Sequence, residues 1–385
     1  MTSAVALGAV VFASFTAGSS GAARAADPRI GWRLASDAAV TTNASAAHGG
    51  ENASRVTLPR APRPTFQVRL APPILGELTT DARGRLLVAH GSDRLTLLDA
   101  QGKTVWSVRL GTALASGPLA ISPSRTLLVA RDGRLFEVTP AGVASERESL
   151  PWSELEGTVV SAPTGDGGAI LAVGARLARL GTRGTRGFQT KVASAIRAVF
   201  SWRGATLAVG RDGTVWLRGS AGGPNELASF GEPLSQVRLV GDQLLGLAGH
   251  ALVALDLATK RRAVLFTDAA DELHDLAIAS DGRLSLVAGR AMLVELAQNG
   301  HELGRVSLPT AESGVELASV LVDQNGTRYV SASGAPLLAV TPQGDISAVA
   351  GTGCPDPLRL APLANGHLVA ACRSGLLAGL SDTAR

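Results

Sequence analysis

Short apolar runs separated by turn-forming residues fill most of the chain after residue 65. Representative runs are 86–89 (LLVA), 127–130 (LLVA), 207–210 (LAVG) and 284–287 (LSLV). Apolar runs of about four to eight residues bounded by turns are typical of strands that are buried on both faces. Apolar spacing of three and four never persists for more than two helical turns. The pattern therefore predicts an all-β fold.

These strands belong to a repeat. The turn after the first strand of each unit recurs with a mean spacing of about 40 residues, close to the length of a four-stranded propeller blade. A second and a third turn follow in most units, and Gly adopts the positive φ of hairpin turns at little cost. The sequence thus predicts four-stranded antiparallel blades. The first-turn residues are Gly84, Ser124, Gly167, Gly204, Gly241, Gly282, Gly326 and Gly366.

Seven units are complete, and the last, from about Pro357, has only two or three strands. The missing strand lies at the other end, because residues 65–70 (TFQVRL) match the fourth-strand pattern of 106–110 (WSVRL) without a unit in front of them. Pairing this strand with the last blade removes open sheet edges. We therefore predict an eight-bladed β-propeller closed by 65–70. Seven blades remain the alternative, because the fifth unit has a degenerate third turn (258–260) and the third unit is rich in Ala and Gly.

Composition agrees with a globular chain of many turns. Of 385 residues, 45% are hydrophobic, 18% are charged and 45 residues are glycine, which excludes wholly disordered and fibrous classes. Aromatic residues make up 4%, too few for binding sites built from several stacked rings. The net charge of +4 is spread along the chain, and the densest basic cluster, 260–262, lies in an expected loop. We therefore predict no nucleic acid partner.

The N-terminus resembles an export signal. Residues 4–15 are apolar and too short to span a bilayer comfortably, and 23–25 (ARA) fit a cleavage site. No Lys or Arg precedes the apolar run, so an uncleaved anchor or a different start codon remains open. We predict a signal peptide at 1–25, a disordered Ala/Ser/Pro-rich linker at 26–64 and a propeller at 65–385. The expected location is periplasmic or secreted, with no stable membrane span after cleavage.

One unit carries a family resemblance. Residues 81–111 contain Asp81-x-x-Gly84, an L-x-x-L-D segment ending at Asp99, then Gly102 and Trp106. This pattern resembles the repeat of the PQQ-like (quinoprotein-type) β-propeller family, especially its non-catalytic branch, which includes the propeller subunit of the outer-membrane barrel-assembly machinery. Other segments are less specific, and 274–282 looks more like NHL-type or WD40-like propellers. The resemblance implies a fold strongly and a function weakly.

The resemblance does not imply a quinone. Quinone-dependent dehydrogenases of this fold use adjacent cysteines and an acidic calcium site, whereas Cys354 and Cys372 are far apart in sequence. The tryptophan that ends each blade in close family members is present here only as Trp106. We therefore predict no cofactor.

Candidate chemistry is sparse. His274 beside Asp275 could form an oriented base, but adjacent strand residues point to opposite faces. The Asp-Gly pairs at 132–133, 212–213 and 281–282 lack the further acidic ligands of calcium loops, so they indicate turns. Residues 181–187 lack the Gly-Lys-Ser/Thr ending of a phosphate loop and are interpreted as a third turn. We predict no catalytic, cofactor-binding or metal residues. No two of the histidines at 48, 90, 250, 274, 301 and 367 have metal-ligand spacing.

Two functions remain. The first, which we favour, is a monomeric binding or scaffolding module without chemistry of its own, with a protein or peptide partner on a loop face. The second is a propeller enzyme of the lactonase, lyase or oxidoreductase type, with residues from several blades meeting at the central channel. Three or more carboxylates or histidines at the channel mouth would favour the enzyme.

The two cysteines, Cys354 and Cys372, are candidates for a disulfide. In an oxidising compartment a bridge across the 17 intervening residues would stabilise the fold by about 3 kcal/mol. The alternative is two small buried apolar side chains. For exported protein we expect thiol titration under denaturing conditions to find no free thiol before reduction and two after it. Two free thiols without reductant would contradict the disulfide.

Overall fold

The computed structural model describes the chain from residue 32 to residue 381 with gaps, and all of its named elements are strands. Within this part no helix is long and apolar enough to cross a membrane. The described residues are 32–34, 63–81, 85–122, 124–152, 155, 159–182, 186–219, 222–279, 281–309, 317–323, 325–332, 337–349, 358–362, 367–372 and 374–381.

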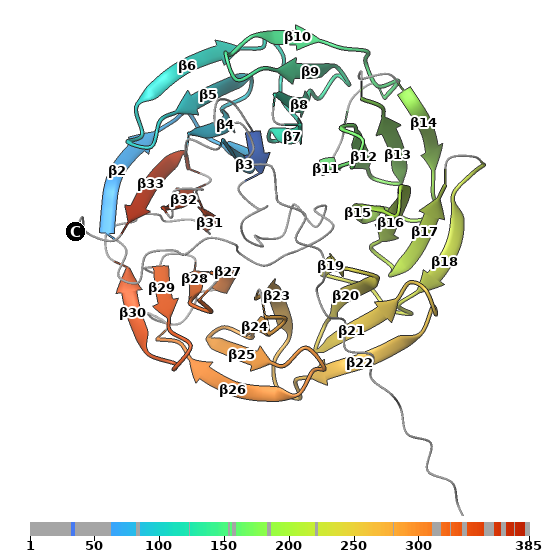
Figure 1. The fold of residues 1–385 in the computed structure, drawn as a ribbon, viewed down its shortest axis with the longest axis vertical. Coiled ribbons are helices and arrows are strands. Elements are labelled where there is room, and N and C mark those ends of the chain that lie inside the picture. Colours follow the sequence, from blue (N-terminus) through green and yellow to red (C-terminus); the bar gives the residue numbers. More distant parts are fainter. Residues whose placement is uncertain are drawn as a thin grey trace, which may run out of the picture.

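The strands form eight antiparallel sheets arranged as blades around a central axis (Figure 1). The side of each blade nearest this axis is called its channel side. Blade 1 contains β3 (Ile74–Asp81), β4 (Leu86–His90), β5 (Arg94–Leu98) and β6 (Thr104–Arg109). Blade 2 contains β7 (Leu119–Ser122), β8 (Arg125–Val129), β9 (Leu135–Val138) and β10 (Ala144–Glu146). Blade 3 contains β11 (Val159–Pro163), β12 (Ala169–Val173), β13 (Arg176–Leu180) and β14 (Arg186–Lys191). Blade 4 contains β15 (Ile196–Trp202), β16 (Ala205–Gly210), β17 (Thr214–Arg218) and β18 (Asn225–Ser229).

The second half of the ring repeats this order, with the first strand of each blade at the channel and the fourth at the rim (Figure 1). Blade 5 contains β19 (Gln236–Val240), β20 (Gln243–Ala248), β21 (Ala251–Asp256) and β22 (Arg262–Thr267). Blade 6 contains β23 (Leu273–Ile278), β24 (Leu284–Ala288), β25 (Met292–Leu296) and β26 (Glu302–Ser307). Blade 7 contains β27 (Leu317–Val322), β28 (Arg328–Ala332), β29 (Leu337–Val340) and β30 (Ile346–Val349). Blade 8 contains β31 (Leu358–Pro362), β32 (Leu368–Cys372), β33 (Leu376–Ser381) and β2 (Arg63–Arg69).

The predicted closure of the ring is confirmed. β2 pairs antiparallel with β33, with Arg63 opposite Ser381 and Arg69 opposite Leu376, so a strand from the beginning of the propeller forms the rim of the last blade. The strand begins at Arg63, two residues before the predicted start. The propeller has eight blades, and the seven-blade alternative is excluded.

The degenerate third turn of blade 5 forms without glycine. Lys260 adopts a positive φ of 60°, and the carboxylate of Asp256 accepts hydrogen bonds from the backbone N–H and the hydroxyl of Thr259 at 2.6 and 2.8 Å. The carboxylate of Asp256 thus stabilises a turn conformation that a glycine would adopt freely. The Ala-rich third blade is also complete, since every residue of β12 is buried.

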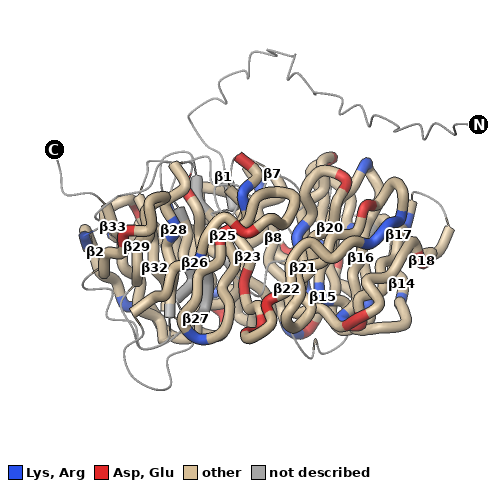
Figure 2. The backbone as a smooth tube through the Cα atoms, turned by 90° about the horizontal axis from the view of Figure 1, so that it is seen from below, with Lys and Arg blue, Asp and Glu red and all other residues tan. Residues whose placement is uncertain are grey.

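An additional strand lies inside the segment predicted to be a linker. β1 (Trp32–Leu34) pairs antiparallel with β3, with Trp32 opposite Asp81 and Leu34 opposite Thr79. Because β3 is the first strand of blade 1, β1 becomes a fifth strand on the channel side of that blade. Figure 2 shows it beside β7 of blade 2. The predicted signal peptide and the rest of the linker lie outside the described residues and stay predictions.

Neighbouring blades pack through the apolar faces of their sheets. β4 is buried at all five positions, whereas the rim strand β6 alternates between exposed and half-buried residues. Between blades 1 and 2, Leu95 and Leu97 pack with Leu128 and Phe136 in one core cluster. Burial on both faces explains why the inner strands are continuous apolar runs in the sequence.

The rim strands dock on the third-turn glycines of the following blade. The ring of Phe66 covers Gly102, and the ring of Trp106 covers Gly142 while its Nε1 donates to the carbonyl of Pro140 at 3.2 Å. Both glycines have positive φ, +77° and +82°. A Cβ at either position would also overlap the aromatic ring, so the contact needs glycine for conformation and for space.

This double requirement can be measured at Gly102. We expect Gly102→Ala to lower the free energy of unfolding by about 2–4 kcal/mol, because it adds overlap with Phe66 to the cost of a left-handed alanine. Gly111→Ala is the matched control, because Gly111 has a φ of +70° and nothing within 4 Å of an added Cβ. Its expected loss is about 1 kcal/mol. Equal losses in urea denaturation would show that the Phe66 contact imposes no constraint.

Candidate functional site

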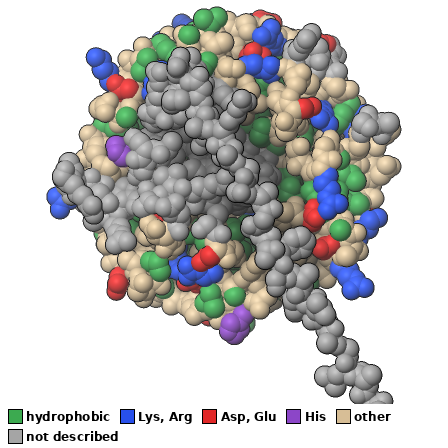
Figure 3. Space-filling view, in the orientation of Figure 1, with side chains coloured by type: hydrophobic (Ala, Val, Ile, Leu, Met, Phe, Trp, Pro, Cys, Tyr) green, Lys and Arg blue, Asp and Glu red, His purple; other side chains and the backbone are tan. Residues whose placement is uncertain are grey.

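The two faces of the disc are built by different connections. The first turns of the blades and the third turns of blades 1 to 7 lie on one face, here called the first-turn face, because strands alternate in direction. The second turns and the connections between blades lie on the other, the second-turn face. In Figure 3, basic side chains are spread round the described part of the visible face with acidic ones among them, rather than gathered into one basic patch.

A pocket of about 570 Å³ opens on the second-turn face where blades 8, 1 and 2 meet. It is formed by the connection from β2 to β3, the second turn of blade 1, the connection from blade 1 to blade 2, and the second turn of blade 2. Its walls combine apolar side chains with three arginines and one aspartate. The lining residues are Ala71, Pro72, Pro73, Leu75, Gly91, Ser92, Asp93, Arg94, Arg109, Ala113, Leu114 and Arg131.

Backbone hydrogen bonds fix the walls of this pocket. The N–H of Gly91 donates to the carbonyls of Ala71 and Pro73 at 2.9 and 3.0 Å, and the N–H of Leu114 donates to the carbonyl of Ser92 at 2.7 Å. The second turn of blade 1 is thereby tied to the connections on both sides. Because these bonds are made by the backbone, the pocket is formed before any ligand arrives.

The pocket carries an excess of positive charge. Nε of Arg109 donates to Oδ2 of Asp93 at 2.5 Å, and this bond raises the pKa of Arg109. Asp93 is buried, whereas Arg94 and Arg131 are exposed. Among the described residues, neither of these two arginines forms an ion pair or hydrogen bond through its side chain. Two guanidinium groups are therefore available to a ligand.

His90 lies directly behind the second turn of blade 1. Its Nε2 is 2.8 Å from Oγ1 of Thr96, which is 2.9 Å from Oγ of Ser107, so a polar chain crosses blade 1 toward the rim. The side chain is 4% exposed. Burial lowers the pKa of His90, and the charge of Arg94 lowers it further. The imidazole is therefore neutral at pH 7, and its hydrogen bond to Thr96 joins β4 to β5.

The pair His274–Asp275 does not form one site. Asp275 is fully buried and accepts hydrogen bonds from Nε2 of Gln236 and from the N–H of Val320, the latter at 2.9 Å. Nη2 of Arg238 lies 3.9 Å from its Oδ1. Burial raises the pKa of Asp275, and Arg238 opposes the shift. His274 is exposed, in agreement with the expected opposite orientation.

Asp275 therefore links blades 5, 6 and 7, a role that sequence reasoning did not assign. Its three partners come from the inner strands β19 and β27, whereas Asp275 itself lies in β23. The signal that could have identified it is a carboxylate directly before the apolar residues Leu-Ala-Ile of the same strand.

The Asp-Gly pairs form turns. The carboxylates of Asp132, Asp212 and Asp281 each accept a hydrogen bond from the backbone N–H two residues later, at 3.1, 3.1 and 3.0 Å. β13 ends at Leu180 and β14 begins at Arg186, so the last two residues of 181–187 belong to a strand and no helix follows the segment. In the described ranges no group of three or more His, Cys, Asp or Glu side chains could hold a metal ion.

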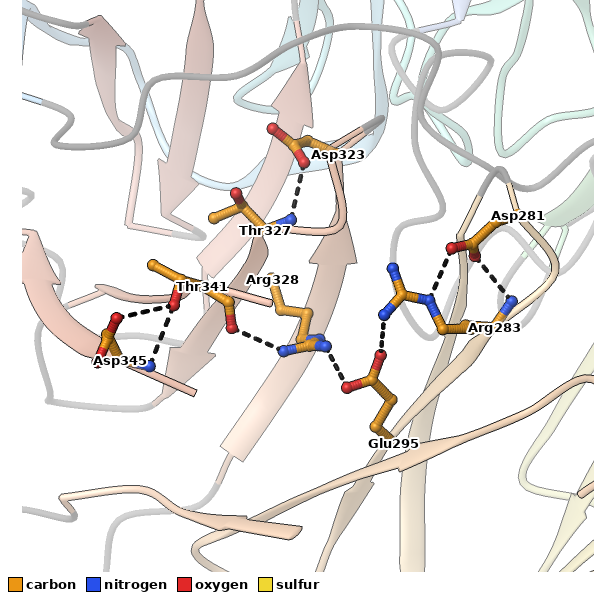
Figure 4. Close-up of polar contacts among 8 residues, drawn as sticks. All are labelled: Asp281, Arg283, Glu295, Asp323, Thr327, Arg328, Thr341 and Asp345. Atoms are coloured by element: carbon orange, nitrogen blue, oxygen red, sulfur yellow. Dashed lines mark hydrogen bonds and ion pairs between the residues drawn. The ribbon is translucent and has the colours of Figure 1, made fainter. Parts of the chain in front are cut away.

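A polar cluster on the first-turn face joins blades 6 and 7 (Figure 4). Glu295 accepts hydrogen bonds from Nη1 of Arg283 at 2.8 Å and from Arg328, which also donates to the carbonyl of Thr341 at 2.9 Å. Arg328 is 3% exposed. Both arginines bind the one carboxylate of Glu295, so the cluster stabilises the interface between blades 6 and 7.

Only one of the two cysteines in the predicted disulfide lies among the described residues. Cys372 is buried in β32 at 1% exposure and is not a free thiol. Cys354 lies outside the described residues, so the pairing of the two stays a prediction.

Comparisons place the chain among known propellers. Residues 37–297 match the family described as outer membrane protein assembly factor BamB. The structure of BamB from Moraxella catarrhalis is 17% identical, with 82% of this chain and 98% of that chain covered and a TM-score of 0.55. The computationally designed Ika8 protein is 13% identical, with coverage of 83% and 99% and a TM-score of 0.65. Streptogramin B lyase is 12% identical, with coverage of 82% and 96% and a TM-score of 0.51.

At these identities the structural likeness shows the fold alone. No curated protein sequence matches the chain significantly.

The neutral state of His90 has a consequence for stability. Because its folded-state pKa lies below the ordinary 6.5, only the unfolded chain binds this proton as the pH falls through 6.5. The contribution of His90 to the free energy of unfolding is therefore complete above pH 6.5. It decreases as the pH falls from 6.5 toward the folded-state pKa, by at most about 1.4 kcal/mol per pH unit. In urea denaturation between pH 7.5 and 5, we expect the stability advantage of wild type over His90→Gln to shrink. If the difference in unfolding free energy between wild type and His90→Gln stayed constant over this pH range, the lowered pKa of His90 would be contradicted.

Proposed function

Because the chain belongs to the family described as outer membrane protein assembly factor BamB, we propose that it is an exported propeller that binds a protein or peptide partner without chemistry of its own. The family description supports a protein partner, and together with the predicted signal at 1–25 it supports a periplasmic or secreted location. We propose further that the partner docks on the second-turn face.

The observation that carries this proposal is the preformed pocket between blades 8, 1 and 2. Its volume of about 570 Å³ suits one or a few side chains of a bound segment, and loops on a rigid scaffold are common places for binding. Pro72, Pro73 and Leu114 offer apolar contact. Such a mixture of apolar walls and arginines is typical of the central part of protein interfaces.

The charges of the pocket define the chemistry of the partner. Arg94 and Arg131 have no acidic partner among the residues described, whereas Arg109 is already bonded to Asp93. An acidic side chain or a terminal carboxylate of the partner would form charge-assisted hydrogen bonds with these two groups. We therefore propose an acidic segment with at least one apolar side chain as the docked part.

The alternative of a propeller enzyme requires polar residues of several blades to meet at the channel. On the described residues, β1 lies on the channel side of β3, so a site near blade 1 would have to form beside this strand. A binding module would lose its protein partner when the arginines of the pocket are substituted, whereas an enzyme would lose turnover when channel residues are substituted.

The proposal can be tested by recovering the partner from the cell envelope of the source organism. We expect the tagged wild type to retain a protein partner, and the double variant Arg94→Glu with Arg131→Glu to retain at least tenfold less, because two attractive charges become repulsive. Lys103→Glu is the matched control, since this exposed residue lies in the third turn of the same blade on the opposite face. Its recovery should equal that of wild type.

Recovery that is unchanged in the double variant would refute docking at the pocket. A wild type that retains no partner but turns over a small molecule, with loss of turnover on substitution of channel residues, would support the enzyme. Quantitative mass spectrometry after cross-linking provides the measurement.

A further inference from the structure

Two arginines of blade 4 lie together on the second-turn face, away from the pocket of blades 8, 1 and 2. Arg197 is the second residue of β15, the strand next to the channel, and Arg211 lies in the turn between β16 and β17. Ile196 pairs with Gly210 in the register of β15 and β16, so Arg197 and Arg211 each adjoin one residue of this pair. The charge of Arg211 lowers the pKa of Arg197 in addition to the effect of burial. The 13 residues between them in sequence form the hairpin that brings them together.

The backbone around both residues is fixed. The N–H of Arg211 donates to the carbonyl of Ala195 at 2.8 Å, and the carbonyl of Arg211 accepts from the N–H of Leu234 at 3.0 Å. Arg197 occupies an irregularity in the pairing of β15 with β16, between Ile196 and Ala198. Such bulges redirect a side chain from the regular alternation of a strand. The two arginines thus project from a rigid frame.

Among the described residues, neither guanidinium group forms an ion pair with a carboxylate. Arg197 donates one hydrogen bond, from Nη2 to the carbonyl of Ser235, and Arg211 makes no side-chain hydrogen bond or ion pair among the described residues. Arg109 and Arg203 differ in this respect, since they pair with Asp93 and Asp242.

The surroundings favour an added negative charge. Arg197 is only partly exposed, and burial lowers its pKa before the charge of Arg211 adds to the effect. The two like charges repel each other, and an anion bound to both removes that repulsion. A guanidinium presents donors in a planar fork that matches the two oxygens of a carboxylate or phosphate.

We propose that Arg197 and Arg211 form a binding site for an oxyanion, a carboxylate or phosphate group that both guanidinium groups hold on the second-turn face of blade 4. The carbonyl of Ser235 orients Arg197, and the turn of blade 4 places Arg211 beside it. The site is separate from the pocket and does not depend on the proposed protein partner.

The test uses the whole purified protein and two small probes. Thermal unfolding is followed while sodium phosphate or sodium acetate replaces sodium chloride at constant ionic strength and pH 7. We expect phosphate to raise the Tm of the wild type by about 1–3 °C in a saturable way, because an anion that binds only the folded state stabilises it. A rise with acetate as well would assign a general carboxylate and phosphate site, and a rise with phosphate alone would assign a phosphate site.

Substitutions connect the effect to the two arginines. Arg211→Gln should lose most of the rise and should melt no lower than wild type in chloride, because it removes the repulsion and leaves the backbone contacts intact. Arg290→Gln is the matched control, since Arg290 is an exposed second-turn arginine of blade 6, and it should keep the full rise.

The proposal is overturned by no saturable rise in the wild type with either probe, or by an equal rise in Arg211→Gln. Phosphate binding can also be followed directly by the phosphorus NMR line width. Broadening that is the same in wild type and Arg211→Gln would likewise count against the site.

Discussion

The pairing of β2 with β33 is the contact on which the rest of the ring depends. It joins residues near position 65 to residues near position 380, and it converts a row of blades with two open edges into a closed ring. It also builds the pocket, because the chain leaves β2 at Arg69 and runs directly into its wall. The N–H of Leu70 donates to the carbonyl of Gly375 at 2.8 Å, and the carbonyl of Ala71 accepts from Gly91. Closure and pocket are therefore one structural unit.

Local pattern was sufficient to predict most of the fold. Short apolar runs such as 86–89 are strands because they are buried on both faces, and the spacing of turn residues gave the number of blades. The closing strand was found because 65–70 repeats the pattern of a rim strand. β1 was missed because three residues are too few to show a period, and its pairing with β3 depends on a contact across about 45 residues of chain.

The candidate sites could not be predicted from local sequence pattern, because their residues come from different blades. The pocket joins residues of three blades, and Asp275 meets partners from β19 and β27 that are about 40 residues away on either side. Only the ring geometry brings these groups together. Arginine side chains also join neighbouring blades, since Arg125 donates to the carbonyl of Gly167 and Arg179 to that of Gly204, both at 3.1 Å. A long planar fork can reach the next blade's turn in this way.

The position of β1 has a consequence for how the ring is recognised. Eight similar blades would offer a partner eight nearly equivalent orientations related by rotation. The extra strand on the channel side of blade 1 and the seam between β2 and β33 break this pseudo-symmetry in a single sector. The pocket lies in the same sector, so a partner that binds there, as proposed, would meet a surface that occurs once in the ring and would be held in one orientation.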